Sequence, residues 1–126
     1  AGDRRENVRR IGEVARLFFE SGAVTLCTFV SPYRTDRDRV RALVPEGRFI
    51  EIHVDVDVET AQERDPKGIY AKAQAGEITN LTGIDAPYEA PEAPELTLKT
   101  ADQSVQDAVE AVLAALAEAG IVERGA

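Results

Sequence analysis

Apolar residues near the start of the chain follow a helical pattern. They recur every three or four positions at Val8, Ile11, Ala15 and Phe18. This spacing predicts one amphipathic helix. Asp3 is its expected N-cap, Glu6 the reciprocal capping partner, and Gly22 the residue that ends it.

Three short apolar runs predict strands. Residues 23–30 form a nearly continuous run of apolar and β-branched side chains between Gly22 and Pro32. Such runs are typical of strands buried on both faces of a parallel sheet. Residues 49–54 and 95–100 predict a second and a third strand. Cys27 is then a small core residue, and His53 an ordinary strand residue.

Helices are predicted between and after these strands. They cover about 35–44, 58–63 with Asp57 as its cap, 69–75, and a last helix from the Ser104 cap to Gly120. The apolar face of that last helix comprises Val105, Val109, Val112, Leu113 and Leu116. Residues 64–94 are polar and rich in Gly and Pro, which is typical of a functional segment such as a lid.

Helices alternating with strands predict one α/β domain over residues 1–126, with a parallel sheet flanked by helices. Three strands are few for such a sheet. The first helix also has no strand before it. By pattern alone, an opening β-α unit is missing from this chain.

Composition excludes several classes of protein. The 126 residues carry a net charge of −8, which is unsuited to general nucleic-acid binding. One Cys and one His rule out an internal disulfide and a Cys/His metal site. No apolar run approaches the roughly 20 residues of a membrane helix. The charged N-terminus does not resemble a signal peptide, so a reducing cytoplasm is the expected compartment.

Two places follow predicted strands, where ligands bind in open α/β sheets. Ser31 could offer its hydroxyl and backbone N–H to an anion, or Ser31-Pro32 could simply open the next helix. Asp55 and Asp57 could bind a metal or act as bases. Alternatively, they are a solvated charge and a helix cap.

Arginines gather in residues 4–10 and 34–41, and guanidinium groups pair well with phosphate and sulfate. They indicate a small polyanionic substrate, unless nearby carboxylates neutralise them. Arg64, Lys67 and Lys72 could close over phosphates as a lid. The sequence contains no P-loop signature, no G-x-G-x-x-G and no G-x-S-x-G. Pattern alone therefore stops at an α/β domain with an anion site at its strand ends.

Several segments, in order along nearly the whole chain, carry a family resemblance. They are DRRENVRRI at 3–11, FVSPYR at 29–34, GRFIE at 47–51, ERDPKGIY at 63–70, AGEI at 75–78 and TGIDAPYEAP at 82–91. Together they resemble adenylyl-sulfate kinases, which phosphorylate the 3′-hydroxyl of adenylyl sulfate with ATP in sulfate activation. The resemblance implies a P-loop nucleotide kinase-like fold with a mobile lid.

The resemblance also implies site residues. Substrate binding falls to Arg4, Asn7, Val30, Ser31, Pro32, Tyr33, Lys72, Leu81 and Ile84. Ser31 is the candidate catalytic residue, because the family's serine has been considered as a phosphate acceptor, although direct transfer needs no such intermediate. Residues 64–94 would be the lid and substrate loop, with Arg64 and Lys67 approaching ATP. Positive charge placed in this way suits phosphoryl transfer.

Two features depart from the family pattern. Leu81 replaces the aromatic residue that stacks on the substrate's adenine. The Walker A loop and the D-G-D-x-x-R segment are absent, and with them the phosphate cradle and the ligands for Mg²⁺. No metal ligand is therefore assigned in this chain, although the cofactor implied is ATP with Mg²⁺. The 126 residues alone are expected to be inactive, because nothing positions the β- and γ-phosphates.

Two interpretations follow. The chain is the C-terminal part of a kinase, free-standing or fused to ATP sulfurylase, or it is a non-catalytic remnant that binds adenylyl sulfate or regulates a partner. Intact lid motifs favour the first. A third interpretation, another P-loop nucleotide kinase with a different acceptor, fits the motif set poorly. By analogy with the family, a homodimer is expected, with adenylyl sulfate and ATP as the small-molecule partners and with no nucleic acid or membrane.

Overall fold

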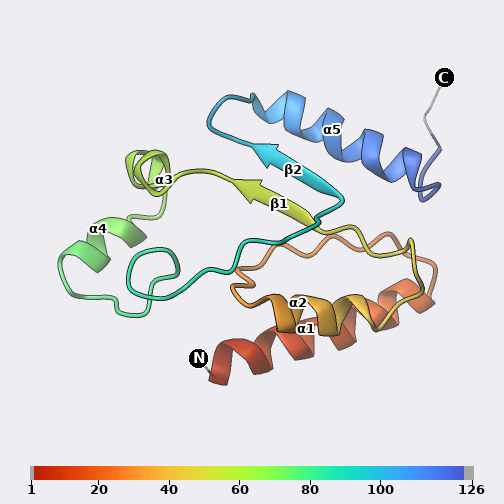
Figure 1. Cartoon of the computed structure of the whole chain (residues 1–126), viewed down its shortest axis with the longest axis horizontal. Coiled ribbons are helices and arrows are strands. Elements are labelled where there is room, and N and C mark those ends of the chain that lie inside the picture. Colours follow the sequence, from red (N-terminus) through yellow and green to blue (C-terminus); the bar gives the residue numbers. More distant parts are fainter. Residues whose placement is uncertain (1, 124–126) are drawn as a thin grey trace.

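The computed structural model describes residues 2–123 (Figure 1). Within them the elements are α1 (Gly2–Glu20), α2 (Arg34–Arg41), β1 (Ile52–Asp55), α3 (Val58–Arg64), α4 (Ile69–Gln74), β2 (Leu96–Lys99) and α5 (Val105–Glu118). Each of the predicted helices is present, with ends moved by a few residues. None of the helices in this range has both the length and the apolar content that crossing a membrane requires.

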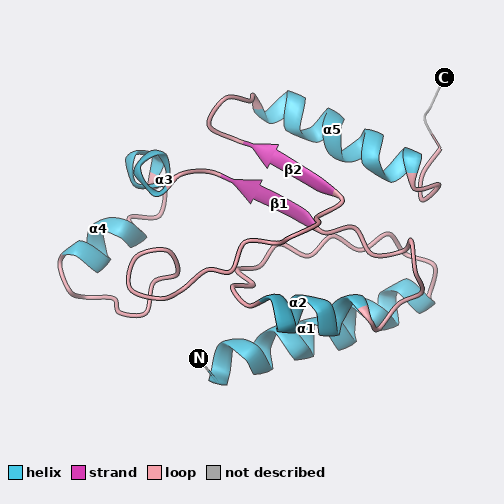
Figure 2. Ribbon diagram, in the orientation of Figure 1, coloured by secondary structure: helices cyan, strands magenta, loops and turns pink. Residues whose placement is uncertain are grey.

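The sheet lies between two layers of helices. β1 and β2 pair in parallel, with Ile52 opposite Leu96 and Asp55 opposite Lys99. In Figure 2, α5 lies on one side of the strands and α1 with α2 on the other. The predicted α/β architecture with a parallel sheet is confirmed.

The strand predicted over residues 23–30 is wrong for the structure. Residues 2–123 contain a sheet of two strands, and residues 23–30 are exposed and irregular. Leu26 is 72% exposed and Phe29 is 55% exposed. A strand needs a neighbouring backbone to bond its N–H and C=O groups, and no strand in the described part of the chain takes that place. Cys27 is accordingly exposed, against the prediction that it lies in a core.

The two ends of α1 differ in how well they match the prediction. α1 already includes Asp3 in its first turn, so Asp3 is not its cap as predicted. Glu6 accepts hydrogen bonds from Arg9 and Arg10 instead, and these bonds lower the pKa of Glu6 to about 2. Gly22 does end the helix, with a φ of 87° that favours glycine.

The main helix contact joins α1 to α2. Gly12 is buried there against Val40 and Leu43, and Val8 is buried in the same helix. Leu98 of β2 is buried in the sheet. Many other apolar side chains stay exposed, among them Leu17, Val54, Val105 and Leu113. The described chain therefore builds a small core.

Candidate functional site

Two distant segments meet beside α2. The Glu89 backbone N–H donates to the Pro32 carbonyl at 2.8 Å, and the Glu89 carboxylate accepts from the Arg34 N–H at 2.8 Å. The Pro32 side chain is fully buried. The FVSPYR and TGIDAPYEAP motifs, predicted to share a site, are thus in direct contact.

The start of α1 reaches the same region. Arg4 donates to the Thr82 hydroxyl at 2.7 Å and to the Asn80 carbonyl at 3.2 Å. The Arg5 guanidinium lies over the Tyr33 ring, 4.7 Å from its centroid. Residues from three parts of the chain therefore surround one corner of the molecule. The two Arg4 bonds hold residues 80–82 against the start of α1.

The 80–86 segment is an ordered turn. The Asp85 carboxylate accepts from the backbone N–H of Asn80 and of Leu81, at 2.7 and 2.5 Å. Asn80 has a φ of 61°, a left-handed conformation that asparagine tolerates. Leu81 is half-buried and Ile84 is 45% exposed. The turn thus holds two partly exposed apolar side chains, Leu81 and Ile84, on one ordered segment.

Other predicted substrate residues lie on the surface. Asn7 is exposed on α1, and Val30 is 60% exposed. Ser31 and Tyr33 are half-buried. The Ser31 carbonyl accepts a hydrogen bond from Arg37 at 2.6 Å, so its backbone is fixed. Asn7 and Val30 are therefore exposed, whereas the backbone at Ser31 is held in place by Arg37.

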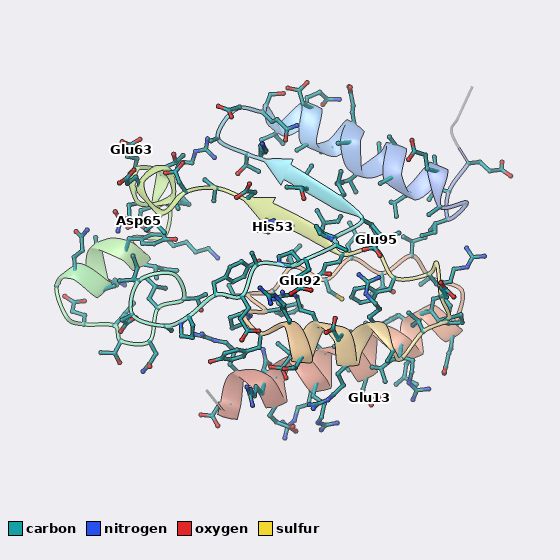
Figure 3. The ribbon with its side chains drawn as sticks, viewed as in Figure 1. Glu13, His53, Glu63, Asp65, Glu92 and Glu95 are labelled. Carbon is teal, nitrogen blue, oxygen red and sulfur yellow. The ribbon has the colours of Figure 1, made fainter. Side chains whose placement is uncertain are left out.

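The predicted lid and substrate loop, residues 64–94, is divided in the structure: residues 80–90 belong to this corner, and α4 lies in the part before them. α3 and α4 project at the left of Figure 1, and Figure 3 places Glu63 and Asp65 there, away from Glu92 and Glu95. Arg64 donates to the Thr100 carbonyl at 2.9 Å, just after β2. Lys67 and Lys72 are exposed. Arg64 is thus bonded to the segment that follows β2, and the two lysines are open to solvent.

Carboxylates neutralise many of the grouped arginines. Arg37 pairs with Glu51 at 2.7 Å, and Arg41 pairs with Glu51 and Glu95. A cavity of about 330 Å³ beside them is lined by Arg34, Arg37, Arg41, Asp38, Glu51 and Glu92, with Pro91 and Ala93. Three cations face three carboxylates there. This cavity is therefore not a ready anion site, which favours the paired-arginine alternative for residues 34–41.

The ion pairs shift two pKa values. A hydrogen bond from Arg41 lowers the pKa of the Glu95 carboxyl, and the same bond raises the pKa of Arg41. Figure 3 shows Glu95 at the start of β2 and Glu92 on the segment that leads to it. Glu95 also accepts from the Glu51 backbone N–H at 2.6 Å. These bonds connect Glu95, directly before β2, to α2 and to the residue directly before β1.

Asp57 acts as a helix cap. Its carboxylate accepts from the Thr60 N–H at 2.7 Å, and this bond lowers the pKa of Asp57. Asp55 is exposed at the end of β1. Residues 2–123 bring together no group of three or more Asp, Glu, His or Cys side chains able to hold a metal. These residues do not fit a Mg²⁺ site of their own, and no step is assigned to one here.

Sequence reasoning missed three residues that organise this corner. Glu51 and Glu89 each bond a group from another segment, and Asp85 bonds two backbone N–H groups of its own turn. Glu89 and Asp85 lie inside the quoted TGIDAPYEAP motif, and Glu51 inside GRFIE. Only those motifs pointed to Glu51 and Glu89, because local spacing does not predict partners 14 or 55 residues away.

Comparisons with known proteins agree on one family. The family model described as adenylylsulphate kinase matches residues 1–99. An adenylyl-sulfate kinase of Acaryochloris marina is 55% identical over 121 residues, which are 96% of this chain and 59% of that protein. The bifunctional enzyme NodQ of Azospirillum brasilense is 50% identical over 121 residues, 96% of this chain and 20% of that enzyme.

A solved structure gives the same result. The Mycobacterium tuberculosis APS kinase CysC, in complex with AMPPNP and APS, superposes with a TM-score of 0.86 at 38% identity. The match covers 92% of this chain and 68% of that one. The chain spans about three fifths of the length of the curated Acaryochloris relative.

Proposed function

The chain belongs to the adenylylsulphate kinase family, and from this premise we propose that it carries the adenylyl sulfate side of an ATP-dependent 3′-phosphotransferase. The substrate would lie at the corner where α1, residues 31–33 and residues 80–90 meet. The direct contact between Pro32 and Glu89 is the single observation that carries this proposal. It joins two family motifs that are far apart in sequence.

Individual residues take roles that follow from their chemistry. Asn7 offers an exposed amide at the start of α1, and the Tyr33 side chain and Ser31 backbone form one wall. Leu81 and Ile84 offer apolar surface for a base. Ser31 remains the candidate catalytic residue. Arg64, Lys67 and Lys72 are proposed to approach when the lid closes, since positive charge around the transferring group is the main requirement.

The ATP phosphates need a cradle that these residues do not form. The sequence contains no P-loop signature, and the curated Acaryochloris relative is longer than the matched stretch. We propose that polypeptide outside these 126 residues supplies that cradle and the ligands for Mg²⁺. An adenylyl sulfate-binding domain without catalysis is the alternative. A soluble cytoplasmic location, a homodimer and a sulfurylase partner remain proposals by analogy with the family.

Binding is tested by NMR titration of the chain with adenylyl sulfate. Wild type is expected to bind weakly, with amide shifts at residues 31–33 and 81–85. Asn7→Ala is expected to weaken binding about fivefold, as for one lost hydrogen bond. Glu13→Ala, on the same helix with its side chain 43% exposed, is the control and is expected to bind like wild type. No shifts at these residues would overturn the proposal.

Catalysis is tested by joining the chain to the part of the Acaryochloris kinase that it does not match. Transfer from ATP to adenylyl sulfate is expected from the joined protein and not from the chain alone. Binding by the chain, with a joined protein that folds and stays inactive, would support the non-catalytic alternative.

A further inference from the structure

Arg37 uses each of its three side-chain nitrogens on a different segment of the chain. Nε donates to the Glu51 carboxylate at 2.7 Å, Nη1 to the Ser31 carbonyl at 2.6 Å and Nη2 to the Glu89 carbonyl at 2.6 Å. These partners lie 14, 6 and 52 residues away in sequence. One guanidinium therefore sets the spacing of three backbone segments.

The surroundings of Arg37 make this arrangement a fixed one. The Arg37 side chain is 11% exposed and that of Glu51 is 14% exposed. A charge so far removed from water must be paired and hydrogen-bonded, and both conditions are met here. The guanidinium also lies 5.8 Å from the centroid of the Tyr88 ring. Movement of any one partner would leave a buried charge or carbonyl unsatisfied.

The two carbonyls that Arg37 holds belong to the proposed substrate corner. Ser31 begins the turn that continues through Pro32 and Tyr33, and Glu89 follows the 80–86 turn. The bond from the Glu89 N–H to the Pro32 carbonyl runs beside the Arg37 bonds. Arg37 lies on α2 and bonds both segments from that helix.

We propose that Arg37 is a positioning residue for adenylyl sulfate, acting through the Ser31 and Glu89 carbonyls without touching the substrate. The inference rests on the proposed function, because it assumes that residues 31–33 bind that substrate. Lysine cannot replace Arg37 in this role. An ammonium is a compact charge on a flexible stem, whereas the guanidinium presents planar donors in a rigid fork.

The test compares Arg37→Lys with Arg39→Lys in the 126-residue chain. Both variants keep the charge, and Arg39 lies on the same helix with its side chain 64% exposed. Arg37→Lys is expected to bind adenylyl sulfate about tenfold more weakly, because an ammonium cannot keep all three bonds and a hydrogen bond to a charged group is worth about tenfold. Arg39→Lys is expected to bind like wild type. Equal affinities for all three proteins would overturn the inference.

A second measurement needs no substrate. Hydrogen exchange of the Glu89 amide, which donates to Pro32, is expected to accelerate in Arg37→Lys and to stay unchanged in Arg39→Lys. A variant that unfolds at lower temperature but keeps the wild-type exchange and affinity below its transition would overturn the positioning role. If wild type fails to bind adenylyl sulfate, the proposed function fails, and Glu89 exchange alone decides whether Arg37 sets the spacing.

Glu51→Gln is a second variant that tests the same contact if Arg37→Lys fails to fold. It retains an oxygen that accepts from Arg37 and removes the charge. Affinity about threefold below wild type and a smaller acceleration of Glu89 exchange are expected, because hydrogen bonds to charged groups are the stronger ones. Wild-type values for both would overturn the inference.

Discussion

Leu81 limits how strongly the proposed corner holds an adenine base. Stacking on an aromatic side chain contributes about 1–3 kcal/mol per base, and an aliphatic side chain keeps only part of that contact. Leu81→Phe is therefore expected to tighten adenylyl sulfate binding about tenfold. Titration calorimetry or the NMR titration measures the change.

Leu113→Phe is a matched control for that substitution. Leu113 is 52% exposed on α5, on the other side of the sheet from α1 and α2. It is expected to leave affinity unchanged. Unchanged affinity for Leu81→Phe as well would count against a base contact at position 81.

Glu95 predicts an acid-sensitive contribution to stability. Its hydrogen bond from Arg41 holds the Glu95 pKa below its ordinary value of 4.5. A lowered folded-state pKa stabilises the fold above the ordinary value, and the contribution is lost as pH falls through the lowered pKa. Glu95→Gln should therefore reduce the free energy of unfolding at pH 7 by less than about 1 kcal/mol, since solvent screens the pair.

Urea unfolding at several pH values measures this contribution. The difference between wild type and Glu95→Gln is expected to shrink below pH 4.5. Glu92→Gln serves as the control, because the Glu92 side chain is 78% exposed. A difference that stays constant over the whole pH range would show that the charge of Glu95 is not the cause.

Helix caps could be predicted from the sequence, whereas hydrogen bonds between residues far apart in the chain could not. Asp57 and Ser104 were predicted as caps because they stand directly before helical segments, and each accepts a hydrogen bond from a backbone N–H of its helix. The contacts of Arg37 span up to 52 residues. Since pairing at such distances depends on the whole fold, the sequence showed only that arginines are grouped.

Gly12 allows α1 and α2 to approach closely. A Cβ at this position would lie 2.8 Å from Val40 Cγ2 and 3.3 Å from Leu43 Cδ1. Gly12→Ala gains about 1 kcal/mol of helix propensity but overpacks a contact, which costs typically 1–3 kcal/mol. A net loss of about 1 kcal/mol in the free energy of unfolding is expected from these two terms.

Chemical denaturation of Gly12→Ala and Gly2→Ala checks this balance. Gly2 lies in the same helix, and a Cβ there would meet nothing within 4 Å. Gly2→Ala is expected to be neutral or stabilising. A stabilised Gly12→Ala variant would mean that α2 shifts to make room.

At the scale of elements, the helices were predicted better than the strands. A helix satisfies its backbone within one segment, so the periodicity of α1 and the caps of α3 and α5 were sufficient to predict these helices. A strand needs a neighbour, and residues 23–30 are apolar enough for a strand but lack one among residues 2–123. The apolar residues at 23–30 therefore predicted a preference for strand structure, but not whether a strand forms.

At the scale of the whole molecule, the motifs predicted which segments meet. Residues 4, 31–33 and 80–90 share one corner, as the family resemblance implies. Of the cations expected in the lid, Arg64 is bonded to the Thr100 carbonyl in this structure. A lid that moves cannot be placed from sequence order alone, because its position depends on what it closes over.

Among residues 2–123, one edge of β1 has no strand beside it, and residues 23–30 are exposed. Unpaired strand edges and exposed apolar side chains favour edge-to-edge aggregation. At pH 7 the net charge of −8 opposes aggregation by repulsion between molecules. This repulsion vanishes near the isoelectric point of about 4.7 and returns, with positive sign, at lower pH. Solubility is therefore expected to be lowest near pH 4.7 and to recover on either side of it.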